Sequence, residues 1–128
     1  MSQTNASTLP LVLLVEDDPG SREVMTLALE AEGFAVVALG SGEEALQSLG
    51  TLSPCGLVTD LSLVGMSGTE MTRKLRAQPK HDSLGVIALT GWDPKGLPRE
   101  DAALFSRVFL KPVDIAQLAT AIRALPGC

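Results

Sequence analysis

The sequence has few of the residues that build zinc–thiolate and zinc–imidazole sites. It contains two cysteines, Cys55 and Cys128, and a single histidine, His81. The histidine lies in the polar segment PKHDS, far along the chain from either cysteine, so a zinc ligand set is missing. Because the apolar content can supply a core without a covalent link, we expect both cysteines to be free thiols in a reducing cytoplasm.

Long apolar runs and an excess of basic residues are also missing. No run approaches the roughly 20 residues that cross a bilayer, and residues 1–10 lack the basic and apolar regions of a secretory signal. The formal net charge of −5 argues against a nucleic-acid-binding surface. We therefore expect a cytoplasmic protein that contacts neither membrane nor nucleic acid directly.

What the sequence does contain fits one globular domain. Its 128 residues are 45% hydrophobic and 20% charged, which is enough to bury a single core. We assign residues 1–10 to a polar lead-in and residues 11–126 to the domain, and we expect no output domain within the sequence.

Five short apolar runs, each nearly unbroken, are typical of strands that are buried on both faces. Helical patterns separate them, and this alternation predicts parallel βαβ units. We predict an α/β fold, a flavodoxin-like doubly wound five-stranded parallel sheet of order 2-1-3-4-5 with five helices. The fourth helix should be short and begin near Pro98, because WDPKGLPRED holds two prolines. The predicted strands are Leu11–Val15, Phe34–Leu39, Leu57–Thr59, Val86–Leu89 and Val108–Leu110.

Polar residues suited to capping stand at the predicted helix starts. Asp18 precedes Pro19, and Asp114 precedes the last helical pattern. Ser41 and Ser67 are each followed three residues later by glutamate, the spacing of a capping box.

Chemistry should concentrate where the strands end, because ligands of open α/β sheets bind outside the carboxyl ends of the strands. Any one polar residue there could simply belong to a solvated turn. Together, however, they offer four acids, a hydroxyl and an ammonium at one edge. These residues are Glu16, Asp17 and Asp18 after the first strand, Asp60 after the third, Thr90 after the fourth and Lys111 after the fifth.

This set of groups suits phosphoryl transfer to a carboxylate. Crowded carboxylates must protonate or share a cation, and hard oxygen ligands suit Mg²⁺. A carboxylate can then attack phosphorus and form an acyl phosphate. Lys111 and the Thr90 hydroxyl could donate to the phosphoryl oxygens.

Four segments, VLLVEDDP, VTDLSLVGMSG, VIALTG and FLKPV, resemble in order and spacing the motifs of response-regulator receiver domains, of stand-alone or hybrid-kinase type. The resemblance runs from about Leu11 to Leu125. It implies a signalling switch rather than a conventional enzyme, although such a domain catalyses its own aspartyl phosphorylation and dephosphorylation.

Position by position, the resemblance makes Asp60 the phosphoacceptor, Thr90 the switch hydroxyl and Lys111 the phosphate-binding lysine. The metal, Mg²⁺ or alternatively Mn²⁺, would be bound by Glu16 (mainly through a water), Asp17, Asp60 and the backbone carbonyl of Ser62. Asp18 follows the acidic pair and is expected to be an N-cap. Gly65 and Gly68 match turn glycines, and the bond from Lys111 to Pro112 matches one that is usually cis.

The resemblance also implies partners. A sensor histidine kinase or histidine phosphotransfer domain would donate the phosphoryl group, and a downstream protein would read the fourth helix, fifth strand and fifth helix. A second copy of the chain could use the same surface as a homodimer.

Three positions depart from the family pattern. Val64 stands where proline is common, and we expect little consequence. Val108 replaces a frequent aromatic switch residue, while Phe109 should face the other side of the sheet. Trp92 lies two residues after Thr90. It either restricts water access to the phosphoryl group, or it caps the sheet edge or packs on the irregular fourth helix.

Other functions fit less well. Gly40–Ala45 matches the dinucleotide-binding pattern G-x-G-x-x-A, but Glu43 and Glu44 would repel a pyrophosphate. A haloacid-dehalogenase-type phosphatase needs a second acid at the position of Ser62. An interaction module that works without phosphorylation stays open, because Val108 weakens the usual switch.

Overall fold

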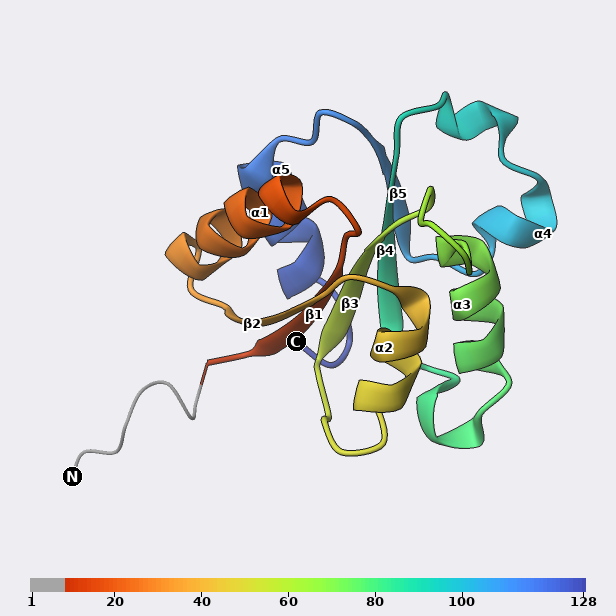
Figure 1. Ribbon diagram of the computed structural model, residues 1–128, viewed down its shortest axis with the longest axis horizontal. Coiled ribbons are helices and arrows are strands. Elements are labelled where there is room, and N and C mark those ends of the chain that lie inside the picture. The colour runs from red at the N-terminus through yellow and green to blue at the C-terminus, as the bar shows by residue number, and fades with distance from the viewer. Residues whose placement is uncertain (1–8) are drawn as a thin grey trace.

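The computed structural model describes residues 9–128, so residues 1–8 of the predicted lead-in lie outside the described residues. Five parallel strands form one sheet in the order β2-β1-β3-β4-β5 (Figure 1), which confirms the predicted doubly wound fold. The strands are β1 (Leu11–Val15), β2 (Ala35–Leu39), β3 (Gly56–Asp60), β4 (Gly85–Thr90) and β5 (Arg107–Leu110). The helices are α1 (Pro19–Ala31), α2 (Gly42–Ser48), α3 (Gly68–Arg76), α4 (Arg99–Ala102) and α5 (Ile115–Arg123).

Two strands reach one residue further than the sequence predicted. Asp60 is the last residue of β3 and pairs with Leu89, while Thr90 is the last residue of β4 and pairs with Leu110. The parallel ladder continues through both polar residues. Both are therefore held by the sheet itself and not by the loops that follow it.

Successive residues of each central strand supply opposite cores, as the pleat requires. Val12 and Leu14 join the cluster under α1 and α5, while Leu13 and Val15 join the cluster under α2, α3 and α4. All four side chains are essentially inaccessible to solvent. Burial on both faces explains why these strands appear in the sequence as unbroken apolar runs.

The helix starts follow the predicted caps. Asp18 accepts a hydrogen bond from the Ser21 amide at 2.8 Å, and Asp114 accepts one from the Gln117 amide at 3.0 Å. The hydroxyls of Ser41 and Ser67 cap α2 and α3 in the same way. These bonds satisfy amides that have no partner inside their helix.

The fourth helix is short, as predicted, with Pro98 at its N-cap position. It has no buried residue. An ion pair between Arg73 of α3 and Asp101 connects it to the neighbouring helix. A 3₁₀ turn at Pro94–Gly96 fills part of the loop before it.

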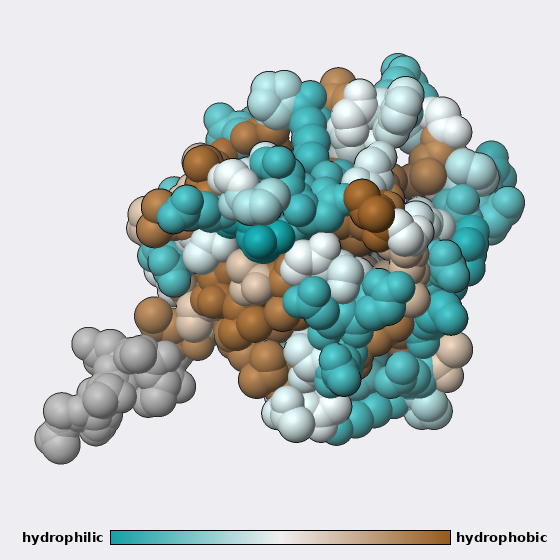
Figure 2. Space-filling view, viewed as in Figure 1, coloured by the Kyte–Doolittle hydropathy of each residue, from teal (hydrophilic) through white to brown (hydrophobic). Residues whose placement is uncertain are grey.

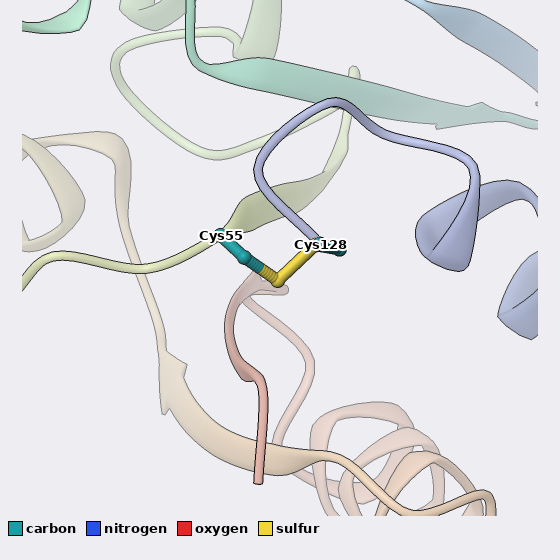
Figure 3. The surroundings of a disulfide bond; sticks show 2 residues. All are labelled: Cys55 and Cys128. Carbon is teal, nitrogen blue, oxygen red and sulfur yellow. A yellow bond between two sulfur atoms is a disulfide. The ribbon is translucent and has the colours of Figure 1, made fainter. Parts of the chain in front are cut away.

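The prediction of two free thiols is wrong, because Cys55 and Cys128 form a disulfide (Figure 3). Their Cα atoms lie 5.0 Å apart although 73 residues separate them in the chain. The cause is topological: α5 runs back along the sheet, so the residues after it reach the edge at which β3 begins. The argument for a cytoplasmic location that rested on free thiols no longer holds, and that location stays a prediction.

The outer strand β2 is only partly covered. All five of its residues are half-buried and apolar, and Figure 2 shows an apolar patch where Figure 1 places this strand. Across residues 9–128, we find no helix that combines the length and the apolar character needed to cross a membrane.

Candidate functional site

The candidate site lies at the carboxyl edge of the central strands. The chain connects β1 to β2 on one side and continues to β3 on the other, so the winding of the sheet reverses between β1 and β3. Loops diverge at such a point and leave a crevice in which ligands bind. The residues that follow β1 and complete β3 are therefore placed side by side.

Three carboxylates meet in this crevice. Glu16, Asp17 and Asp60 each present an oxygen, and these three atoms lie within 4.8 Å of one another. Glu16 and Asp60 are each only 6% exposed, so water screens their charges poorly. The predicted convergence of these acids is confirmed, whereas Asp18 points elsewhere and caps α1. The Ser21 amide that donates to Asp18 holds the pKa of that carboxyl below its usual value.

One ammonium group faces the three acids. The Nζ atom of Lys111 donates to Oδ2 of Asp60 at 2.6 Å and lies 3.5 Å from Oε1 of Glu16. Partial burial alone would lower the pKa of Lys111, but the hydrogen bond and charge of Asp60, with the charge of Glu16, outweigh it and raise this pKa above its usual value. The lysine therefore stays charged and reaches the site from the loop after β5, where the Lys111–Pro112 peptide is cis, as predicted.

Backbone amides of the β3–α3 loop hold two of the carboxylates. The Ser62 amide donates to Oδ1 of Asp60 at 3.3 Å, and the Val64 amide donates to Oδ2 of Asp17 at 2.9 Å. Proline at position 64 could not make the second bond because it has no amide hydrogen. Gly65 has a φ of +81°, and a Cβ on Gly68 would lie 2.3 Å from the Asp60 carbonyl oxygen, so this loop needs both glycines.

A hollow of about 240 Å³ opens over Asp60 and is lined by Ser62, Gly91, Trp92 and Lys111 as well. The Trp92 indole is 72% exposed, and its Nε1 donates to Oγ of Ser62 at 3.3 Å. The Trp92 amide donates to the buried Thr90 hydroxyl at 3.0 Å. Thr90 thus ends β4 one residue before Gly91, which lines the hollow, and its hydroxyl oxygen accepts the Trp92 bond.

The donor set fits a hard divalent cation. Three carboxylates face one ammonium, so the site carries uncompensated negative charge, and two of the carboxylates are buried. All of the offered atoms are oxygens, which Mg²⁺ and Mn²⁺ prefer over nitrogen or sulfur ligands. The ligand roles of these residues and of the Ser62 carbonyl stay predictions.

Known proteins share both the sequence pattern and the fold. The family model described as response regulator receiver domain matches residues 12–123. The chain belongs to this family. A receiver domain (CheY-like) from Methylobacillus flagellatus is 31% identical, with a TM-score of 0.83 over 91% of this chain and 98% of that one.

Two relatives show the range of proteins that carry such a domain. An uncharacterised 14.6-kDa protein of Leptolyngbya boryana is 36% identical over 84% of this chain and 82% of its own length. The DNA-binding response regulator MtrA of Mycolicibacterium smegmatis is 33% identical over 88% of this chain and 49% of its own length. This receiver domain therefore spans about half the length of MtrA.

The ends of the predicted strands located the acids, Thr90 and Lys111 of this receiver domain, and the resemblance gave their expected roles, but neither predicted three contacts around them. These are the Trp92–Ser62 hydrogen bond, the Val64 amide on Asp17, and a bond from the Arg22 guanidinium to the Glu16 carbonyl at 2.9 Å. Each joins different segments of the chain, and only the unusual Trp92 and Val64 gave a hint in the sequence.

Proposed function

We propose that this receiver domain is a phosphoacceptor switch in which Asp60 takes a phosphoryl group from a phosphohistidine. A sensor histidine kinase or a histidine phosphotransfer domain would carry that group. The observation that supports this most directly is the position of Asp60, which is buried at the carboxyl end of β3 with Lys111 2.6 Å away and two further carboxylates beside it.

In the proposed step, an Asp60 carboxylate oxygen attacks phosphorus. A P–O bond forms as the P–N bond to the donor imidazole breaks, and the electron pair leaves with the imidazole nitrogen. Lys111, which donates to Asp60 at 2.6 Å, would move from the carboxylate to the phosphoryl oxygens, and the Thr90 hydroxyl would donate to them as well.

A divalent cation, when bound, would make this step feasible at so acidic a site. Mg²⁺, or Mn²⁺ in its place, would neutralise the carboxylates and the incoming phosphoryl oxygens when bound. Glu16, Asp17, Asp60 and the Ser62 carbonyl would hold it. The protein residues supply the remaining functions: the amides of Ser62 and Val64 orient Asp60 and Asp17, and Lys111 balances charge.

We further propose that the Trp92 indole restricts water access to the phosphoryl group. Its hydrogen bond to Ser62 joins two residues that line the hollow over Asp60 and links the loops after β3 and β4. The predicted alternative, packing on α4, finds less support because the side chain is 72% exposed.

The output surface would comprise α4, β5 and α5, for a downstream protein or a second copy of the chain. Val108 lies partly buried on the α4 side of β5 and Phe109 on the other, as the pleat predicts. Leu110 at the end of β5 is 51% exposed. Phosphorylation should shift amide resonances of this surface, and sedimentation with and without the phosphoryl group would detect a homodimer.

The deciding experiment is incubation with Mg²⁺ and a small-molecule phosphodonor, followed by intact-mass measurement. We expect one phosphoryl addition that requires Mg²⁺ and disappears in Asp60→Asn. Asp82→Asn is a matched control, because Asp82 is an exposed aspartate before β4. Addition to Asp60→Asn would show that another residue is the phosphoacceptor. No addition to the wild type, together with no Mg²⁺ binding, would favour an interaction module that works without phosphorylation.

A further inference from the structure

Arg22 places a positive charge near the amino end of α1, beside the acidic loop that follows β1. It is the fourth residue of a helix that begins at Pro19 and has no acidic residue in its first turn. The amino end of a helix carries a partial positive charge, so a cation there costs free energy. The carboxylate of the N-cap residue Asp18 attracts this charge, and Arg22 as a whole is half-buried.

The main contact of Arg22 is with the acidic loop of the site. Its Nη1 donates to the backbone carbonyl of Glu16 at 2.9 Å. The other polar groups of Glu16 are also engaged: its amide donates to the Leu39 carbonyl at 3.0 Å, and its Oε2 accepts from the Asp18 amide at 3.1 Å. Arg22 thus fixes the peptide group that joins Glu16 to Asp17.

Gly40 provides space for this guanidinium. A Cβ on Gly40 would lie 3.1 Å from Nη1 of Arg22, closer than ordinary van der Waals contact. Gly40 does not have a positive φ, so the backbone conformation does not explain the glycine. The guanidinium therefore lies against three segments, namely α1, the loop after β1 and the loop after β2.

We propose that Arg22 is a positioning residue for the metal site: it fixes the Glu16 carbonyl and so directs the carboxylates of Glu16 and Asp17 toward Asp60. This inference rests on the proposed Mg²⁺ binding. The charge of Arg22 alone would act in the opposite direction, since a nearby cation repels Mg²⁺. The sign of the change on removing Arg22 therefore separates positioning from simple charge.

The test is a Mg²⁺ titration followed by backbone amide chemical shifts, which report the affinity and the integrity of the fold in one experiment. We expect Arg22→Met to weaken Mg²⁺ binding about five-fold, the scale of one lost charge-assisted hydrogen bond that is partly replaced by water. Arg22→Lys should recover part of the loss, because it keeps the charge and one donor. Arg99→Met is the matched control, since Arg99 is exposed on α4.

A second variant displaces the guanidinium without removing its charge. Gly40→Ala should weaken Mg²⁺ binding about two-fold, less than Arg22→Met, because the flexible arginine can give way by a few tenths of an ångström. Unchanged or tighter binding in Arg22→Met would overturn the inference. If the wild-type protein does not bind Mg²⁺, both the proposed function and this inference are wrong. If the wild type binds Mg²⁺ and the variants bind it equally well, only this inference is wrong.

Discussion

The two ends of β3 differ in almost every physical respect. At its carboxyl end, Asp60 faces other charges and a hollow of about 240 Å³. At its amino end, Cys55 forms the disulfide to Cys128, and the side chain of Leu125 packs tightly over Gly56 and Gly85. The five residues of β3 thus connect the charged candidate site at one edge of the sheet to a tightly packed, disulfide-linked region at the other.

This difference indicates that the two edges of the sheet have different roles, one in function and one in stability. The carboxyl edge gives up stability by crowding like charges, and tight packing and a covalent link at the amino edge offset that loss. Changes at the amino edge should therefore alter the free energy of unfolding and leave phosphorylation intact. Changes at the carboxyl edge should act mainly on phosphorylation and only weakly on the free energy of unfolding.

The largest expected effect on stability is that of opening the disulfide. Cys128→Ser should lower the free energy of unfolding by about 3 kcal/mol, because the unfolded chain regains the freedom of a long closed loop. Urea denaturation measures this loss, and a dithiol reductant should reproduce it in the wild type but have no effect on the variant. Equal stability of wild type and variant under oxidising conditions would contradict the structural role.

Overpacking the same edge should have a somewhat smaller effect. In Gly85→Ala the new Cβ would lie 2.7 Å from a methyl group of Leu125, so we expect a loss of about 2 kcal/mol. Gly96→Ala is the control, since nothing lies within 4 Å of a Cβ there. Thermal unfolding should show a lower Tm for the first variant alone, with the yield of phosphorylation unchanged for both.

At the opposite edge, Trp92→Ala should shorten the lifetime of the aspartyl phosphate about five-fold, which corresponds to one net hydrogen bond and its shielding. Release of inorganic phosphate after removal of the donor measures the lifetime. Trp92→Phe keeps a ring but loses the bond to Ser62, and Ser62→Ala loses the bond but keeps the indole. If all three variants match the wild type, the indole does not restrict water.

The smallest effect concerns pH. Since the pKa of Lys111 is raised in the folded state above its usual 10.5, the charged lysine stabilises the fold at every pH below about that value. This contribution should be lost as the pH rises further, through the folded-state pKa. Thermal unfolding between pH 9 and 11.5 in chelator should show a steeper loss for the wild type and Lys95→Met than for Lys111→Met. If Tm falls with pH equally in all three proteins, the charged Lys111 does not stabilise the fold.

The sequence predicted the sheet and most of the site for one physical reason. Central strands that are buried on both faces must be apolar throughout, so their runs stand out, and the polar residue that ends a run marks the carboxyl edge. Asp60, Thr90 and Lys111 could therefore be located from the pattern alone. The family resemblance added their expected roles.

The features that were missed depend on how distant segments meet. Nothing in the spacing of Cys55 and Cys128 indicates that α5 returns the chain end to the start of β3. The bond from Arg22 to the Glu16 carbonyl likewise requires the loops after β1 and β2 to lie together, which a single sequence does not specify. Hydrophobic periodicity reports burial, but it does not report which loops become neighbours.

The short helix α4 is a segment that could adopt two arrangements in the same domain. With four residues and none buried, it gains little from the hydrophobic effect, and the Arg73–Asp101 ion pair lies at the surface. An alternative arrangement of this segment therefore costs little free energy. A ligand that interacts only modestly better with that alternative can make it the majority species.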